Sequence, residues 1–288
     1  MWTRGLAGWY GRNGRHHLPW RATRDPWAVL VSEVMLQQTQ VARVRPKWEA
    51  FMERWPTAEA FAAASLEDVL RAWQGLGYPR RALALHRCAI AVAREGWPRD
   101  EAELRELPGV GRYTARALLA LAFEASCPPP LDVNIARVAA RAALGAEPQG
   151  ASQRQIEAAV TAGQPRSMRR RDYVLALFDA GAIHCRSVPR CDGCPLAGTC
   201  RSRRRLAAST TPAPSARRQP PYAGSFRQLR GAVLAAMLVD TQPPTRQALV
   251  RRMKGLTPAP SADAIARAVE SLAADGLVTA SRVPRSDG

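Results

Sequence analysis

Hydrophobic residues recur every three to four positions along most of residues 1–200. This spacing places them on one face of an α-helix. The pattern predicts helices at 28–38, 41–54, 66–73, 80–95, 101–107, 111–124, 152–162 and 170–182. Asp25 followed by Pro26 is a favourable helix start, with the aspartate as N-cap. The alternation typical of strands is missing before residue 200, so an all-α fold is expected there.

The hydrophobic pattern stops at residues 201–220, which are rich in Arg, Ser, Ala and Pro and predict a linker. Residues 221–288 contain three more short helical patterns, followed by Gly276 and the β-prone stretch LVTASRV. This order is typical of a small winged-helix-like module. A helical packing domain that does not contact DNA fits the same pattern equally well.

The chain of 288 residues carries a net charge of +18, almost all of it from arginine. Such an excess favours polyanionic partners, with nucleic acid ahead of an anionic membrane surface. The sequence shows no apolar run of the length of a signal peptide or a membrane span. We therefore expect a cytoplasmic, nucleoid-associated protein that is monomeric.

The stretch ELPGVGRYTARALLAL (106–121) places two glycines at the start of a predicted helix. Gly109 and Gly111 permit backbone conformations and close approaches that a side chain would prevent. The N–H groups at the following helix start attract an anion. The stretch predicts a seat for a DNA phosphate, and a hairpin between two helices without any ligand is the alternative.

Four of the six cysteines lie in the pattern C-x5-C-x2-C-x5-C, formed by Cys185, Cys191, Cys194 and Cys200. Such crowding favours a metal over disulfides in an intracellular chain. The close spacing of four thiolates favours a [4Fe-4S] cluster over a zinc knuckle, which remains the alternative. Arg186, Arg190 and Arg201 would give this loop a basic rim.

Two acidic residues are candidates for chemistry. Glu33 lies among apolar residues of one predicted helix, where burial would raise its pKa and make it a possible general acid. A glutamate on a helix is also often solvent-facing or paired with a cation. Asp132 follows three prolines and precedes a helix, so by itself it predicts no more than a helix cap.

Taken together, LPGVGRYTA (107–115), LDVNIARV (131–138) and the cysteine loop resemble the helix-hairpin-helix DNA glycosylase superfamily. Within it, LPWR (18–21), VSEVMLQQTQV (31–41) and GLGYPRRALALH (75–86) resemble the A/G-specific adenine glycosylases of the MutY family. The resemblance covers residues 1–200. It implies a monofunctional enzyme of base excision repair that flips adenine, mispaired with 8-oxoguanine or guanine, out of double-stranded DNA and hydrolyses its glycosidic bond.

The resemblance also implies site residues and domains. Glu33 would protonate adenine at N7, Asp132 would stabilise the cationic sugar and Asn134 would support Asp132. Trp20 and Arg21 would lie beside the adenine pocket, while Gln38, Leu76 and Tyr78 would wedge into the base stack. The expected domains are a six-helix barrel with the hairpin (20–130), an iron-sulfur cluster subdomain (1–19 and 131–200), the linker (201–220) and the C-terminal module (221–288), with the adenine bound in a groove between the first two.

Two features depart from the family pattern. The first cysteine gap is one residue shorter than usual, which leaves His184 as an alternative ligand. Residues 221–288 are too few for the Nudix-like domain that reads 8-oxoguanine, so the resemblance does not specify the opposite base. A thymine or uracil mismatch glycosylase of the same superfamily, and a non-catalytic metal-containing DNA-binding protein, are the rival interpretations.

Tyr113 stands directly after the hairpin, where strand-cutting members of the superfamily carry a lysine. A phenol cannot form the Schiff base on which β-lyase chemistry depends. The chain has only two lysines, Lys47 and Lys254, and neither lies in a matching motif. We therefore expect base removal without strand cleavage.

Overall fold

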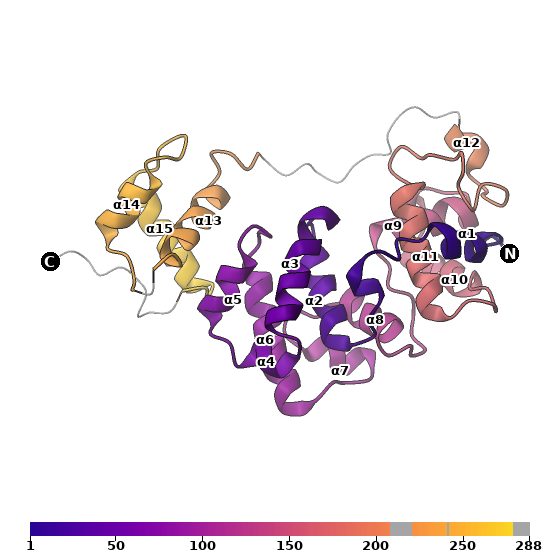
Figure 1. The fold of residues 1–288 in the computed structure, drawn as a ribbon. Coiled ribbons are helices and arrows are strands. Elements are labelled where there is room, and N and C mark those ends of the chain that lie inside the picture. Colours follow the sequence, from indigo (N-terminus) through magenta and orange to yellow (C-terminus); the bar gives the residue numbers. More distant parts are fainter. Residues whose placement is uncertain (208–220, 241, 279–288) are drawn as a thin grey trace. The chain divides into compact units, whose positions relative to one another are not determined.

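The computed structural model describes residues 1–207, 221–240 and 242–278. Every regular element within these residues is helical, as Figure 1 shows. The all-α prediction is confirmed for the described part of the chain. No helix in that part is long and apolar enough to cross a lipid bilayer.

The chain forms two compact units, and each combines two separate stretches of sequence. Unit 1 comprises Met1–Glu33 and Trp97–Arg217, and unit 2 comprises Val34–Gly96 and Arg218–Gly288. The predicted barrel, residues 20–130, contributes to both units. The domain limits drawn from the sequence therefore stay a prediction.

Unit 1 is organised around α8 and α11, two helices most of whose residues are buried. Figure 1 shows α9 running beside α11. The helices of this unit are α1 (Leu6–Asn13), η1 (Pro19–Arg21), most of α2 (Pro26–Leu36), α7 (Glu101–Glu106), α8 (Arg112–Leu121), α9 (Val133–Ala139), the π-helical η2 (Ala140–Leu144), η3 (Pro148–Gly150), α10 (Gln153–Ala162), α11 (Arg170–Ile183) and α12 (Arg203–Ala207).

Unit 2 contains two groups of helices. One has an aromatic core in which Phe51, Trp55, Phe61 and Trp73 meet, mostly edge to face. The other is the C-terminal module. The helices are α3 (Val41–Arg54), α4 (Ala58–Ala62), α5 (Leu66–Trp73), α6 (Arg80–Glu95), α13 (Phe226–Met237), α14 (Arg246–Met253) and α15 (Ala262–Ala274).

The C-terminal module is joined to the rest of unit 2 by arginine contacts. Asp275 forms ion pairs with Arg80 of α6 and Arg230 of α13. Arg71 of α5 donates to the carbonyl of Leu238 at 2.8 Å. The three predicted helices of the module are confirmed, whereas most of the β-prone stretch lies outside the described residues.

The helix predictions succeed where polar and apolar faces are well separated. Three predicted helices, 41–54, 66–73 and 80–95, have the observed bounds of α3, α5 and α6. The predicted N-cap is confirmed, because Asp25 accepts from the N–H groups of Trp27 and Ala28. Of the predicted linker, Arg203–Ala207 forms the short helix α12, and residues 208–220 lie outside the described part.

Besides α12 and the short η helices, two short α-helices, α1 and α4, were not predicted. α1 contains two glycines and has no side-chain cap, so its intrinsic helix propensity is poor. It is stabilised instead by burying Leu6, Trp9 and Tyr10 in unit 1, where it packs on α11. α4 has only five residues, which is too short for a periodic pattern.

Candidate active site

The predicted hairpin connects α7 to α8 through residues 107–111. Gly109 has φ +78°, a left-handed conformation that favours glycine. Gly111 is extended and serves as the N-cap of α8, with no side chain capping the first N–H groups. A Cβ added at Gly111 would meet no heavy atom within 4 Å. The helix start is therefore open to a ligand, although only one of the two glycines needs positive φ.

Glu33, near the end of α2, faces Tyr113 in the first turn of α8. The Tyr113 hydroxyl donates to Glu33 Oε2 at 2.9 Å. Burial raises the pKa of Glu33 to about 7, against the opposing effects of the Tyr113 hydrogen bond and the Arg21 charge. The same burial raises the pKa of Tyr113 well above its usual value. Glu33 thus holds a proton near neutral pH, as a general acid requires.

Asp132 is the N-cap of α9 and a partly buried carboxylate of the same site. Its Oδ1 accepts from the N–H groups of Asn134 (2.9 Å) and Ile135 (2.7 Å), and its Oδ2 accepts from Asn134 Nδ2 at 2.6 Å. Burial raises the pKa of Asp132, and these hydrogen bonds oppose the rise. Hydrogen bonds to a carboxylate stabilise its charged form, so the two acids differ in what surrounds them.

Asn134 is itself held from both sides. Arg137 Nη2 donates to Asn134 Oδ1 at 2.8 Å. Gly181 of α11 lies so close that a Cβ there would come within 2.6 Å of the Asn134 Cβ. The absence of a side chain at Gly181 therefore lets α9 approach α11 and bring Asp132 into place.

Trp20 and Arg21 belong to the short helix η1, in which Trp20 is buried and the side chain of Arg21 is 8% exposed. Arg21 Nη2 donates to Asp179 Oδ1 at 3.0 Å, and its charge lowers the pKa of Glu33. Arg21 Nη1 is buried and has no hydrogen-bond partner within the described residues. Arg21 thus brings a positive charge and an unused donor to Glu33.

The predicted wedge residues lie in unit 2. Gln38 and Tyr78 are exposed, and both have positive φ, at 56° and 50°. Leu76 is only 3% exposed and lies two residues before Tyr78 in the same loop. Its side chain would have to leave this position to enter DNA. The roles of all three residues stay predictions.

The four cysteines of the loop are free thiols. Burial raises the pKa of Cys194 to about 11, and the charges of Cys185, Cys191 and Cys200 add to the rise. The four sulfurs are therefore near enough to influence one another. In the described part of the chain, however, no three His, Cys, Asp or Glu side chains are arranged as ligands of one metal ion.

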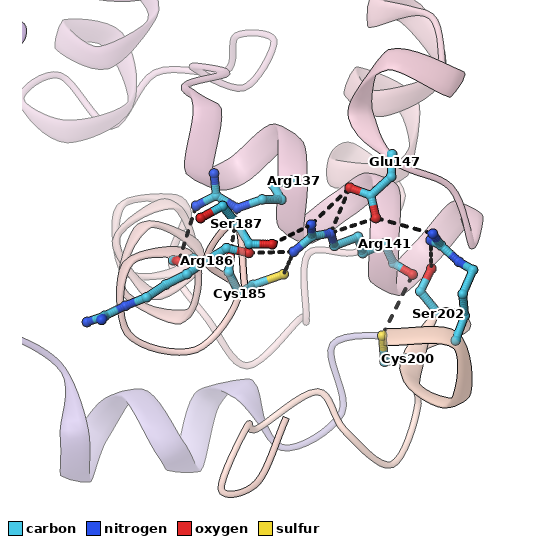
Figure 2. A network of polar contacts seen from close by, with 10 residues as sticks. Arg137, Arg141, Glu147, Cys185, Arg186, Ser187, Cys200 and Ser202 are labelled. Atoms are coloured by element: carbon cyan, nitrogen blue, oxygen red, sulfur yellow. Dashed lines mark hydrogen bonds and ion pairs between the residues drawn. The ribbon is translucent and has the colours of Figure 1, made fainter. Parts of the chain in front are cut away.

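Figure 2 shows how the cysteine loop is attached to unit 1. The guanidinium of Arg141, which is 1% exposed, lies between Glu147 and Cys185, with its Nη1 3.8 Å from Cys185 Sγ. It also donates to the carbonyl of Arg186 at 2.6 Å. Cys200 Sγ donates to the Arg141 carbonyl at 3.7 Å. One buried arginine thus contacts both ends of the cysteine run.

Comparisons with known proteins agree with this arrangement. Residues 31–162 match the family described as HhH-GPD superfamily base excision DNA repair protein, a range that includes Glu33, the hairpin and Asp132. An adenine DNA glycosylase of Mycolicibacterium smegmatis is 45% identical over 95% of this chain and 91% of that protein. The chain belongs to the adenine DNA glycosylase family. The human adenine DNA glycosylase is 39% identical over 70% of this chain and 39% of its own length.

Solved structures show the same fold as this adenine DNA glycosylase family member. A thermostable thymine-DNA glycosylase matches with a TM-score of 0.61 and 26% identity, over 70% of this chain and 95% of that one. A trapped endonuclease III–DNA covalent intermediate matches with a TM-score of 0.58 and 24% identity, over 71% and 95%. The helix-hairpin-helix glycosylase fold predicted from the sequence is confirmed.

Sequence reasoning missed Asp179 as part of this family member's site. It is fully buried on α11 and accepts from the Arg15 backbone N–H (2.9 Å), Arg15 Nε (2.6 Å) and Arg21 Nη2. An aspartate within the otherwise apolar stretch YVLALFDAGAI was the available signal. Its partners are more than 150 residues away in sequence, so the pattern could not name them.

The alternative ligand His184 packs edge to face against Trp9, with ring centroids 5.6 Å apart. Cys185, the next residue, has its sulfur near Arg141 instead. These positions favour Cys185 over His184 as the first ligand of a cluster. The choice between them stays a prediction.

Proposed function

We propose that this protein removes adenine mispaired with guanine or 8-oxoguanine from double-stranded DNA, by hydrolysis and without cutting the strand. The observation that carries the proposal is the pair of unlike carboxylates in unit 1. Glu33 is held by a single phenol and has a pKa of about 7, whereas Asp132 accepts three hydrogen bonds. One acid can donate a proton while the other stabilises positive charge.

In the proposed mechanism, the flipped adenine lies against Glu33, which protonates the base at a ring nitrogen as the glycosidic bond breaks. Asp132 stabilises the oxocarbenium-like sugar until water adds to the anomeric carbon and releases a proton to solvent, and Asn134 keeps the carboxylate oriented toward the sugar. Arg21 offers its buried Nη1 as a donor near Glu33. The N–H groups at the start of α8 would bind a backbone phosphate, and Gln38 and Tyr78 would fill the space that the flipped base vacates.

The absence of lyase activity follows from the residues beside the site. Tyr113 occupies the place after the hairpin, and its hydroxyl is engaged with Glu33. Lys47 donates from Nζ to the Ala72 carbonyl at 3.0 Å within unit 2. Neither group offers a free amine to attack the sugar.

The cysteine loop would hold a [4Fe-4S] cluster through Cys185, Cys191, Cys194 and Cys200. The chemistry of the donor set fits this group, because four half-buried thiols that lie close together become stable thiolates only beside a cation. The cluster, when bound, would act as a structural cofactor that orders the loop. No step of the proposed base removal depends on it.

The test is single-turnover excision on duplexes containing A opposite 8-oxoguanine, A opposite guanine, and T opposite guanine. We expect base loss from the first two duplexes, with strand breaks only after alkali. Base loss from the T·G duplex alone would identify a thymine glycosylase, as the structural match to that enzyme allows. Binding without base loss from any duplex would identify a non-catalytic DNA-binding protein.

A further inference from the structure

Arg81, the second residue of α6, contacts two separate loops of unit 2 through one guanidinium. The first, which we call the Gln38 loop (residues 37–40), follows α2. The second, the Tyr78 loop (residues 74–79), joins α5 to α6. The sequence analysis assigned no role to Arg81, although it lies within the stretch GLGYPRRALALH (75–86).

The contacts of Arg81 are divided between its two terminal nitrogens. Nη1 lies within hydrogen-bond distance of the carbonyls of Val34 (2.9 Å), Met35 (3.3 Å) and Gln37 (2.5 Å). These oxygens belong to the end of α2 and to the Gln38 loop, where a helix leaves carbonyls without intrahelical partners. Arg81 therefore caps the end of α2.

The other nitrogen reaches the Tyr78 loop. Arg81 Nη2 donates to the carbonyls of Leu76 (2.9 Å) and Gly77 (3.0 Å) and contacts Thr39 Oγ1 at 3.3 Å. The guanidinium carbon also lies 5.4 Å from the ring centroid of Tyr78 and 5.5 Å from that of Trp73. One side chain thus joins both loops and approaches the ring of Tyr78.

Both loops contain a residue in a strained conformation. Gln38 and Tyr78 are two of only three non-glycine residues with positive φ in the described part of the chain. Such conformations persist only where the surroundings hold them. The side chains at these two positions are exposed, whereas Leu76 and Trp73 below them are buried. Buried residues therefore hold the two loops in place, while the side chains of Gln38 and Tyr78 are exposed to solvent.

Arginine suits this position for a geometric reason. Its planar guanidinium presents five N–H donors in two directions, whereas lysine has a single nitrogen that can serve one side at a time. The six acceptors lie on the end of α2 and on the two loops, so they require donors that point in different directions from one rigid group. The charge also strengthens each hydrogen bond to a carbonyl.

We propose that Arg81 is a positioning residue that locks the Gln38 loop to the Tyr78 loop, so that both exposed side chains meet the DNA duplex as one preformed wedge. The proposal rests on the proposed function, in which Gln38 and Tyr78 enter the base stack. A wedge that is already ordered loses less conformational freedom on binding than two independent loops would. Arg81 therefore acts on base extrusion and leaves the proton transfer from Glu33 unchanged.

The test compares Arg81→Ala and Arg81→Lys with Arg94→Ala. Arg94 lies in the last turn of the same helix, is exposed, and pairs with Glu95, so its removal changes the charge equally without touching either loop. Hydrogen exchange of the DNA-free protein reports on loop order. Fluorescence of 2-aminopurine, placed in the duplex beside the mispair, reports on unstacking without any need for catalysis.

We expect Arg81→Ala to speed exchange at residues 37–39 and 75–78 at least tenfold and to reduce the fluorescence rise on binding. Single-turnover excision should slow about tenfold or more at saturating protein, while its pH profile keeps the wild-type midpoint. Arg81→Lys should give intermediate values, and Arg94→Ala should match the wild type. If Arg81→Ala does not fold, Arg81→Lys decides the question by the same measurements.

The proposal would be overturned if both Arg81 variants showed hydrogen exchange at the wild-type rate in the two loops. It would also be overturned if the loops exchanged faster but the 2-aminopurine fluorescence still showed wild-type unstacking of the duplex. A shifted midpoint of the pH profile would also overturn it, because Arg81 would then act on Glu33. If the wild type removes no adenine, the proposed function fails while the exchange and fluorescence measurements still test Arg81. The two failures are therefore distinguishable.

Discussion

At the scale of single residues, the surroundings of Glu33 and Asp132 suit one chemical group to the two roles proposed for it. Both carboxylates are partly buried, and burial raises the pKa of each. Asp132 accepts three hydrogen bonds that favour its charged form, whereas Glu33 accepts one, from the phenol of Tyr113. The number of hydrogen-bond donors, rather than the type of residue, therefore distinguishes Glu33, the proposed general acid, from Asp132, the proposed charge stabiliser.

We expect Glu33→Gln to bind mispaired DNA but to lose excision by about three orders of magnitude or more, because the amide keeps the shape and cannot donate the proton. Single-turnover kinetics and a binding titration measure the two properties. Excision within about tenfold of wild type would remove Glu33 from the mechanism.

The same variant should stabilise the protein at high pH. With a pKa of about 7 in the folded protein and 4.5 as the usual value, Glu33 keeps its proton in the fold after the unfolded chain has lost it. The free energy of unfolding therefore falls as pH rises between these values. Relative to wild type, Glu33→Gln should gain roughly 1–3 kcal/mol above pH 7 and little below pH 4.5. Urea denaturation at pH 4.5 and pH 8 measures the difference.

Tyr113→Phe should shift the pH dependence of excision upward. The Tyr113 hydroxyl donates to Glu33 and lowers the pKa of that acid, so its removal raises the pKa further. Excision declines as Glu33 loses its proton, and the alkaline midpoint should therefore move to higher pH. Tyr173→Phe is the matched control, because it removes a buried hydroxyl that bonds to the Val160 carbonyl. Equal midpoints in Tyr113→Phe and the control would show that the Tyr113 hydroxyl does not set the pKa of the group that controls excision.

At the scale of elements, the distance between helices places the groups proposed for catalysis. Asp132 lies at the start of α9, and α9 packs against α11 at Gly181. Because the Asn134 side chain bonds to Asp132, the separation of these two helices is transmitted to the carboxylate. The lack of a side chain at Gly181 thus helps to position the proposed catalytic carboxylate of Asp132.

Gly181→Ala should lower excision about tenfold or more and destabilise the fold by about 1–3 kcal/mol, because the new Cβ overlaps Asn134. Gly11→Ala on α1 is the control, since a Cβ there meets nothing within 4 Å and a helical alanine is favoured over glycine by about 1 kcal/mol. Single-turnover rates and thermal unfolding measure both variants. Normal excision by Gly181→Ala would show that the helix spacing does not control Asp132.

The cysteine loop yields a prediction at the same scale. Protein purified without oxygen should be yellow-brown and contain about four irons per chain, as four clustered thiolates imply. Cys194→Ser should lose iron and destabilise unit 1, whereas His184→Ala should keep the iron. Metal analysis and visible absorption measure these outcomes. Stoichiometric zinc without iron would favour the zinc knuckle instead.

At the scale of the whole molecule, the groups proposed for chemistry and those proposed for probing DNA belong to different units. Glu33, Tyr113 and Asp132 lie in unit 1, while Gln38 and Tyr78 lie in unit 2 together with the C-terminal module. The mycobacterial relative aligns over 95% of this chain, and the human relative aligns over 70%. Most of the C-terminal module therefore aligns with the mycobacterial relative.

Removal of residues 221–288 should leave excision of adenine opposite guanine largely intact, since every proposed catalytic residue precedes them. It should reduce discrimination in favour of 8-oxoguanine if the module reads the opposite base. Loss of the contacts of Arg71 and Arg80 with the module should lower the melting temperature of unit 2. A folded truncated chain without activity on any mispair would make the module part of the catalytic unit.

The sequence by itself determined most of the helices, the hairpin and the family of this protein. Helical periodicity, N-caps and short motifs such as LPGVGRYTA depend on residues that are close together in the sequence, so the sequence alone reveals them. Only the tertiary structure decided which distant groups meet: Asp179 with Arg15 and Arg21, and Arg81 with two loops. It also decided that Leu76 is buried beside the exposed Tyr78. Burial and long-range pairing depend on how helices pack, and many packings satisfy one hydrophobic pattern.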